Sequence, residues 1–282
     1  MFARLSRSWS LVKASADVLR SDKELLLFPL VSSIVALLVA ATFILPVFGM
    51  GLLKDWVGEG GLDVAAYLFL FCFYLAQYFV IFFFNSALVG AALIRLEGGD
   101  PTVRDGLRIA WSRKGAILGY AAIAATVGMV LRAIEERVGV IGRIIVGLLG
   151  TAWTVATFLT VPVLVAQNVG PVDAVKQSVA MLRRTWGENL IGQGGLGLAF
   201  GLMTFVVLLA GLGLTLAMFA IKAPWLGAGM IGMTVLALLL LGLIQAALSG
   251  IYSAALYRYA IAGDTPGGFD AGTLQNAFAP KS

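Results

Sequence analysis

The sequence predicts an all-α membrane protein: a polytopic bundle of six transmembrane helices with three interfacial amphipathic helices on its cytoplasmic side. Three observations predict this fold class. Apolar residues make up 60% of the 282 residues and charged residues only 12%, a balance typical of polytopic membrane proteins and far from that of soluble domains. Uncharged tracts long enough to cross a bilayer recur along the chain. Basic residues concentrate in alternate segments between these tracts.

Six tracts can each form a transmembrane helix, because a bilayer core of roughly 30 Å requires about 20 helical residues. We place the spans near residues 25–48, 64–94, 115–131, 144–168, 189–221 and 223–257. The third is the shortest and can continue past Arg132. In the fourth, Pro162 removes a backbone hydrogen bond and predicts a bend. Residues 1–262 are therefore expected to form one membrane domain, followed by an irregular cytoplasmic tail over 263–282.

The distribution of basic residues predicts the orientation. Fifteen Lys and Arg residues fall in the segments that precede spans 1, 3 and 5 or follow span 6, and five fall in the other loops. The positive-inside rule places the richer set, together with both termini, in the cytoplasm. The net charge of +5 therefore reflects membrane topology, and we expect no nucleic-acid partner.

The segments that precede spans 1, 3 and 5 have the pattern of amphipathic helices, over residues 3–19, 102–114 and 172–184. In the second, for example, Leu107 and Trp111 lie on one apolar stripe with bases around it. We expect these helices to lie parallel to the membrane, with their bases at the anionic headgroups of the cytoplasmic leaflet. The candidate headgroup contacts are Arg104, Arg108, Arg113, Lys114, Lys176, Arg183 and Arg184.

One amphipathic helix followed by a transmembrane hairpin, three times over, is the simplest organisation that fits this order. An offset of 70 residues aligns Pro101 with Pro171 and Arg113 with Arg183, whereas an offset of 68 aligns the apolar stripes better. The three repeated units are therefore a hypothesis with two competing registers.

Most side chains that intramembrane chemistry requires are missing from these spans. The chain has no His, its one cysteine, Cys72, lies in an apolar tract, and no Asp or Glu falls within the spans as placed. Disulfides, zinc sites and His-dependent acid–base catalysis are excluded, and ion-coupled transport loses its usual interior carboxylate. We therefore expect no enzymatic activity, no metal and no cofactor.

A few polar or aromatic residues within the spans are the remaining candidates for a pathway. They are Gln77, Asn85, Trp153, Gln193 and Gln245. Interhelical hydrogen bonds that fix packing are one interpretation of the amides, and a polar pathway is the alternative. The aromatic residues between Tyr67 and Phe84 are expected to face lipid or a neighbouring subunit, and Arg132, near a span end, to reach headgroups.

Three stretches of the chain, residues 84–113, 150–178 and 253–270, resemble an uncharacterised prokaryotic family of six-helix membrane proteins of unknown function. They read FNSALVGAALIRLEGGDPTVRDGLRIAWSR, GTAWTVATFLTVPVLVAQNVGPVDAVKQS and SAALYRYAIAGDTPGGFD. This resemblance implies a fold and a place in a bacterial or archaeal cell membrane, but no activity.

A second, more distant resemblance rests on the run from Pro162 to Gln167 followed by Ala174 and Ser178. This pattern is similar to the membrane domain of bacterial glycerophosphodiester phosphodiesterases. The resemblance to that membrane domain implies an acid at the position where this chain has Gln167, and this departure weakens any role that depends on charge there.

These observations favour a non-enzymatic scaffold or accessory subunit whose cationic helices hold the cytoplasmic leaflet. The alternative is a passive channel or carrier for a small molecule or lipid. The expected partners are membrane lipids, and a second copy of the chain or a membrane partner protein.

Overall fold

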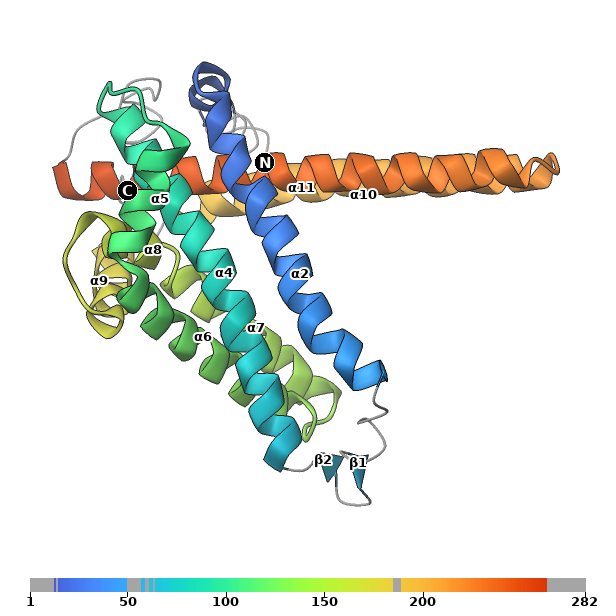
Figure 1. Ribbon diagram of the computed structural model, residues 1–282, viewed down its shortest axis with the longest axis horizontal. Coiled ribbons are helices and arrows are strands. Elements are labelled where there is room, and N and C mark those ends of the chain that lie inside the picture. Colours follow the sequence, from blue (N-terminus) through green and yellow to red (C-terminus); the bar gives the residue numbers. More distant parts are fainter. Residues whose placement is uncertain are drawn as a thin grey trace. The chain divides into compact units, whose positions relative to one another are not determined.

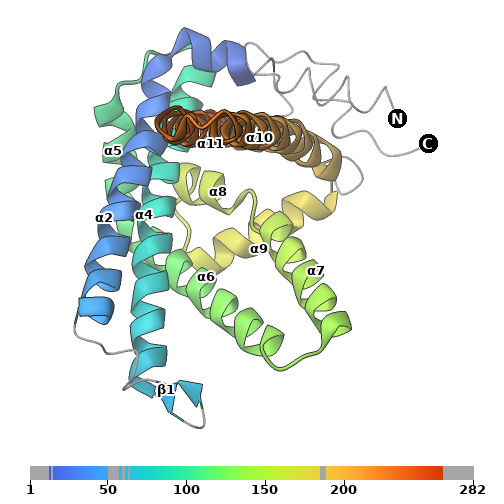
Figure 2. The same ribbon diagram turned by 90° about the vertical axis from the view of Figure 1, so that its right-hand side faces the viewer.

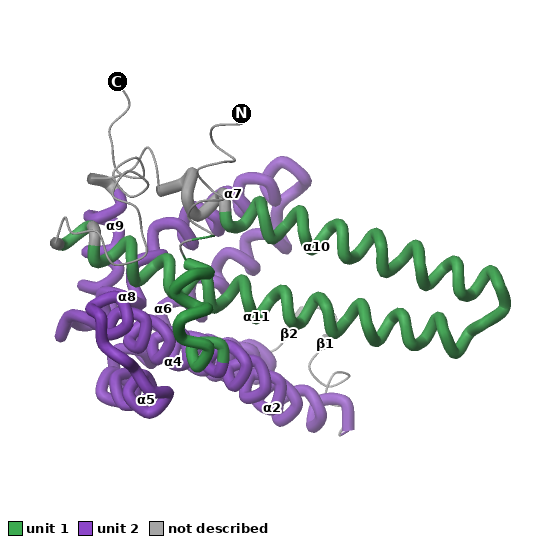
Figure 3. The backbone as a smooth tube through the Cα atoms, turned by 90° about the horizontal axis from the view of Figure 1, so that it is seen from above, with its two compact units in different colours: residues 1–26, 185–282 green, residues 27–184 purple. Residues whose placement is uncertain are grey.

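The structure is a computed structural model that describes Lys13 and residues 15–49, 57–58, 61–62, 64–184 and 189–262. Figure 3 shows that the chain divides into two compact units, one of residues 27–184 and the other of residues 1–26 and 185–282. The described residues are almost entirely helical, with a single pair of two-residue strands.

Among the described residues, six helices are long and apolar enough to cross a membrane, as the sequence predicts. They cover Lys23–Gly49, Val64–Leu96, Lys114–Glu135, Val140–Ala166, Leu196–Ala220 and Pro224–Arg258. The third continues past Leu131 to Glu135, and the fourth begins at Val140. The loop between these two helices is therefore shorter than the spans placed from sequence predict. Arg132, Glu135 and Arg143, which those spans left in the loop, lie on the ends of the helices.

The unit of residues 27–184 is built around one long helix, α4. Its elements are α2 (Leu27–Gly49), β1 (Val57–Gly58), β2 (Gly61–Leu62), α4 (Val64–Leu96), α5 (Val103–Ser112), α6 (Lys114–Glu135), α7 (Val140–Ala156), α8 (Thr160–Ala166) and α9 (Pro171–Arg184). Helix α4 packs against α2, α5, α6 and α8, and Figures 1 and 2 show α2 running beside it. The antiparallel strands β1 and β2 precede α4.

The connection from α4 to α5 follows from its turn residues. Gly98 adopts a left-handed φ of 85° just after α4, a conformation that glycine takes without steric cost. Thr102 then caps α5: its hydroxyl accepts from the Asp105 N–H, and the Asp105 carboxylate accepts from the Thr102 N–H. Gly106 lets α5 approach α4 closely, since a Cβ there would lie 2.6 Å from the Ala87 carbonyl oxygen.

The predicted bend in the fourth span is a break between α7 and α8. The helix is interrupted at residues 157–159, and Pro162 falls in the first turn of α8, where its missing N–H breaks no helical hydrogen bond. Ser178 on α9 bridges the break: its hydroxyl accepts from the Leu159 N–H at 3.1 Å and donates to the Ala156 carbonyl at 2.7 Å. Two backbone groups released by the break are thereby satisfied.

The other unit contains a 3₁₀ turn, η1 (Lys23–Leu26), and the two longest apolar helices besides α4, namely α10 (Asn189–Ala220) and α11 (Pro224–Ala262). Helices α10 and α11 form a hairpin and run side by side in Figure 3. They approach closely where Gly211 faces Thr234, as small residues allow in membrane helices. Lys222 turns the chain with a left-handed φ of 57°.

The structure contains helices at two of the three predicted amphipathic segments. Helix α5 lies within 102–114, and α9 covers the whole of 172–184. Most of the first segment, 3–19, lies outside the described residues. The order of one short helix before two long ones therefore occurs at α5–α6–α7, with α8 as an added turn after α7, and again at α9–α10–α11.

Candidate functional site

In the described part of residues 27–184, two adjoining cavities lie between α4, α6 and α7. The first has a volume of about 610 Å³ and is lined by Tyr74, Tyr78, Gly128, Leu131, Arg132, Glu135, Glu136, Val146, Gly147 and Gly150. The second has a volume of about 420 Å³ and is lined by Tyr78, Phe82, Tyr120, Ala124, Val127, Gly128, Leu131, Gly150, Trp153, Thr154 and Thr157. Because they share four lining residues, we treat them as one site, the α4–α6–α7 groove. Both volumes lie in the usual range of small-molecule sites.

Glycines on α6 and α7 leave the room that the groove occupies. A Cβ at Gly147 would meet no atom within 4 Å, and one at Gly150 would meet only Leu131, at 3.9 Å. Gly128 faces the Tyr78 hydroxyl across the groove, at 3.4 Å from where its Cβ would lie. The space therefore depends on side chains that are absent from the facing helices.

An aromatic column forms one wall of the groove. Tyr74, Tyr78 and Phe82 repeat at four-residue steps on α4, so their rings fall on one face of the helix. The ring centroids are 6.4 Å apart for Tyr74 and Tyr78 and 5.6 Å apart for Tyr78 and Phe82. Phe82 stacks in turn on Tyr120 of α6 at 4.4 Å. The sequence predicted that the aromatics of this stretch face lipid or a neighbouring subunit, whereas these three line a cavity.

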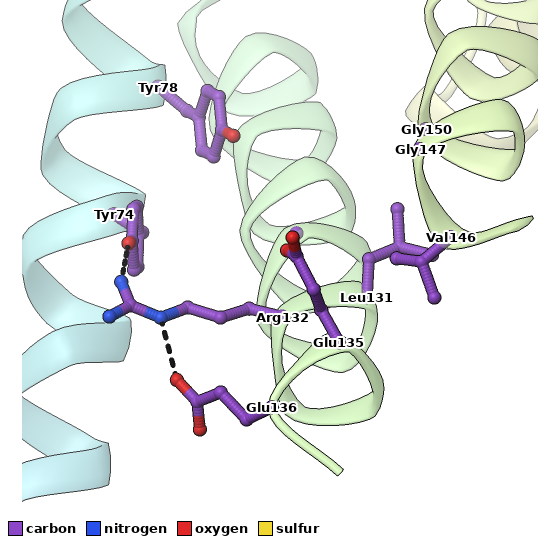
Figure 4. Close-up of a pocket in the computed structure, with 10 residues that line it drawn as sticks. Tyr74, Tyr78, Leu131, Arg132, Glu135, Glu136, Val146, Gly147 and Gly150 are labelled. Carbon is purple, nitrogen blue, oxygen red and sulfur yellow. Dashed lines mark hydrogen bonds and ion pairs between the residues drawn. The ribbon is translucent and has the colours of Figure 1, made fainter. Parts of the chain in front are cut away.

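Charged and hydroxyl groups gather at one end of the groove, which we call the mouth: Tyr74, Arg132, Glu135 and Glu136. The Arg132 Nη1 donates to the Tyr74 hydroxyl at 2.8 Å, and its Nε donates to the Glu136 carboxylate at 3.1 Å (Figure 4). Arg132 was expected to reach headgroups, but its guanidinium instead joins the end of α6 to α4. The contact exists because α6 continues one turn beyond the predicted end.

The opposite, inner end of the groove carries hydroxyl groups. Thr157 follows directly after α7, and its hydroxyl donates to the Trp153 carbonyl at 2.9 Å. The hydroxyl of Tyr120, a residue only 4% exposed, lies beside those of Thr157 and Thr160. The groove therefore has an apolar, aromatic middle between a charged mouth and an uncharged polar end.

Of the four predicted pathway residues whose side chains the structure describes, one lies at the groove. Trp153 lines its inner part. Gln77 lies on α4, and its Nε2 donates to the Ala36 carbonyl of α2 at 3.0 Å, which is the packing role. Asn85 is half-buried on α4 and lines neither cavity, Gln245 is half-buried on α11 in the other unit, and the side chain of Gln193 lies outside the described residues.

Some of the predicted headgroup contacts are exposed, and others interact with residues of the same chain. Arg104 and Arg108 are exposed on α5, on the side opposite its buried residues Gly106 and Ala110. Arg113 instead donates through Nη1 to the Asn168 side-chain oxygen.

Two of the other predicted headgroup contacts, Lys114 and Lys176, interact with neighbouring residues of the chain. The Lys114 ammonium lies 4.3 Å from the centroid of the Trp111 ring, a cation–π contact. Lys176 pairs with Asp173 at 3.6 Å on the surface of α9. The side chains of Arg183 and Arg184 lie outside the described residues.

The residues at the mouth were not identified from sequence, although two local signals were present. Arg132 and Glu136 stand four residues apart, as do Tyr74 and Tyr78, and such pairs lie on one helix face. Which helix faces α6 depends on tertiary packing, so the pairing of Arg132 with Tyr74, 58 positions away, has no sequence pattern of its own.

Six apolar helices and an open groove lined by one unit fit a helical membrane protein with a candidate ligand site. The chain belongs to a family of unknown function, DUF6159, which matches residues 64–268. This match confirms the resemblance to an uncharacterised family and covers every helix of the groove. A comparison with curated proteins found no match, so the similarity to the membrane domain of glycerophosphodiester phosphodiesterases is not supported.

Proposed function

We propose that this protein is a non-enzymatic membrane protein that binds an amphiphilic molecule, a lipid or lipid-like compound, in the α4–α6–α7 groove and passes it along that groove as a passive carrier. This proposal develops the carrier alternative drawn from the sequence. The observation that carries it is the continuity of the two cavities through Tyr78, Gly128, Leu131 and Gly150.

The chemistry of the groove fits an amphiphile better than a polar solute. Its middle is formed by Leu131, Val127, Ala124 and the aromatic column, surfaces that favour a hydrocarbon chain. A sugar, amino acid or ion would lose more hydration there than the few hydroxyl groups of the lining, such as that of Tyr78, could replace. A polar head can instead remain at the mouth beside Arg132.

The proposed setting is a bacterial or archaeal cell membrane with both termini in the cytoplasm. The supporting observation is the unequal distribution of basic residues. In this orientation the loop between α6 and α7, and with it the mouth, lies on the outer side. Glu135 is the last residue of α6 and is exposed, so the middle of the groove offers no carboxylate for proton coupling, and ligand movement is expected to follow its own gradient.

The test is retention of lipid by a variant whose groove is filled. Gly150→Leu adds a side chain where both cavities meet, and replacing a helical glycine also favours the helix by roughly 0.5–1 kcal/mol. We expect the folded variant to lose most of the lipid that the wild type retains through purification, measured by native mass spectrometry.

Gly115→Leu is the matched control. Gly115 lies on α6 and lines neither cavity, and a Cβ at this position would meet no atom within 4 Å. It should retain lipid as the wild type does. If Gly150→Leu retains the same lipid in the same amount, the groove is not the binding site.

A second candidate function, a scaffold held on the cytoplasmic leaflet, is favoured by the surface of α5. Arg104 and Arg108 are exposed on α5, and Trp111 is 62% exposed. Bases beside an exposed tryptophan suit the headgroup level of a membrane that contains anionic lipid. Such a scaffold would bind a partner protein or a second copy of the chain.

Spin labels on α5 test this second candidate. A label at position 111 should show the depth of the headgroup region, while one at position 104 should remain accessible to a water-soluble relaxation agent. Equal exposure of both labels to water would remove the support for interfacial contact.

A further inference from the structure

We infer, as a step that rests on the proposed function, that the groove selects an amphiphile with a zwitterionic head, whose phosphate binds at Arg132 and Tyr74 and whose ammonium group binds at Glu135. The inference starts from the charges at the mouth. Arg132, Glu135 and Glu136 all belong to the end of α6 and line the same cavity. A purely anionic head would meet two carboxylates, and a purely cationic head would meet the guanidinium.

The phosphate half of the site is the guanidinium of Arg132. This group has five N–H donors in a plane, and within the described residues its hydrogen bonds go from Nε to Glu136 and from Nη1 to Tyr74. The remaining N–H groups can donate to two phosphate oxygens, the geometry in which Arg binds phosphate best. Tyr74 accepts from Arg132, so its own O–H can donate to the same phosphate.

The ammonium half of the site is the carboxylate of Glu135. Figure 4 shows its side chain directed into the cavity beside Leu131, on the side of Tyr78, while Glu136 turns toward Arg132. No ion pair joins Glu135 to another residue of the described chain. Since Glu136 pairs with Arg132 and Glu135 does not, the two carboxylates have separate roles. An ammonium group with three donors fits the second.

The spacing along α6 places the two halves at adjacent points of one helix face. Positions three apart in a helix are neighbours, with roughly 5–6 Å between their Cβ atoms. A phosphate and an ammonium group joined by two carbons can therefore reach Arg132 and Glu135 together. The hydrocarbon chain then extends past Leu131 toward Trp153, along the apolar middle of the groove.

The experiment measures retention of single-chain lipids by the full-length protein in detergent, using native mass spectrometry. The probes have hydrocarbon chains of equal length and differ in the head: lysophosphatidylethanolamine, lysophosphatidylglycerol and the long-chain amine. Phosphoethanolamine without a chain separates a lipid head from the free zwitterion. The wild type should retain the zwitterionic lipid about tenfold more tightly than the anionic one, as expected for one added hydrogen bond to a charged group. The amine and the free head should bind more weakly.

Variants assign the two halves. Glu135→Gln should abolish the preference between the zwitterionic and anionic lipids, and Glu135→Lys should reverse it. Arg132→Gln should weaken both phosphate-bearing lipids by a similar factor. Glu97→Gln and Arg143→Gln are matched controls, because both residues are exposed and line neither cavity, and they should leave retention unchanged.

The outcomes separate this inference from the proposed function. Equal retention of the zwitterionic and anionic lipids, or an unchanged preference in both Glu135 variants, overturns the head assignment while Gly150→Leu still tests the groove. Free phosphoethanolamine bound as tightly as the lipid overturns the amphiphile itself. If the wild type retains none of the three lipids, the proposed function is the part that fails.

Discussion

At the residue scale, single polar side chains hold the groove's framework where helices end or break. Ser178 is fully buried, and its hydroxyl forms hydrogen bonds with the Leu159 N–H and the Ala156 carbonyl. These two backbone groups have no helical partner at the break between α7 and α8. Gln77 similarly joins α4 to α2 through one backbone carbonyl. Both interactions stabilise helix packing. Removing either side chain lowers the free energy of unfolding, because the backbone group that it contacts stays buried without a hydrogen bond.

Ser178→Ala should lower the free energy of unfolding by about 1–3 kcal/mol, because it leaves the Leu159 N–H buried without its acceptor. The measurement is denaturant unfolding in mixed micelles. Ser112→Ala is the control: Ser112 is exposed at the end of α5, and its hydroxyl donates to the Ile109 carbonyl of the same helix. A control as unstable as Ser178→Ala would contradict the bridging role.

Asp105 introduces a pH dependence at the start of α5, outside the apolar helices. Hydrogen bonds from the Thr102 hydroxyl and the Thr102 N–H hold the pKa of this carboxyl below its ordinary value of 3.8. A lowered pKa in the folded state stabilises the cap fully above the unfolded pKa, and the effect is lost as pH falls through the folded pKa. The protection factors of the amides across residues 103–112, which correct for the intrinsic pH dependence of exchange, should therefore fall below about pH 4. Asp105→Asn should remove that pH dependence, and an unchanged profile would disprove the cap's contribution.

At the element scale, the ends of helices account for the largest differences between sequence and structure. The spans themselves are readable, because 20-residue apolar tracts have few alternatives. The end of α6 cannot be read from the sequence in this way, because Arg132 interrupts the apolar run. In the structure the helix continues past Arg132, whose side chain contacts Tyr74 and Glu136. Likewise Pro162 predicted a bend, but the break lies earlier, where Ser178 of another helix can satisfy it.

The contact between α4 and α5 provides a test at this scale. Gly106→Ala should destabilise the protein by about 1–3 kcal/mol, although alanine favours a helix over glycine by about 1 kcal/mol. The reason is steric: the added Cβ would lie 2.6 Å from both the Ala87 carbonyl oxygen and the Phe28 ring. Gly115→Ala, with open space around it, should be neutral or stabilising in the same thermal unfolding assay. Equal stability of the two variants would mean that α5 does not pack against α4 as described.

At the scale of the whole molecule, the apolar tracts were sufficient to predict six long apolar helices, but not the groove. The groove comes from facing surfaces of α4, α6 and α7, and its space lies at glycines such as Gly147 and Gly150, which look like ordinary helix-packing residues in a sequence. The amides chosen from sequence were conspicuous because they are polar. Only the arrangement of helices distinguishes Gln77, which packs, from Trp153, which lines the groove.

The orientation is a prediction for the whole chain, testable by cysteine labelling in intact cells after Cys72→Ser. Ser112→Cys should react only when the membrane is permeabilised, because 15 of the 20 basic residues lie on its side. Arg137→Cys, in the loop after α6, should react from outside with an impermeant reagent. The opposite pattern would reverse the topology and place the mouth of the groove on the cytoplasmic face.

The central claim, that the α4–α6–α7 groove holds an amphiphile, is tested most directly by a cryo-electron microscopy map of the full-length protein in lipid nanodiscs, enlarged by a bound antibody fragment. We predict elongated density that begins beside Arg132, passes between Tyr78 and Gly150, and ends near Thr157. The same map of Gly150→Leu should lack that density with the helices unmoved. A closed wild-type groove, with α7 packed directly on Tyr78 and no density between them, would contradict the account.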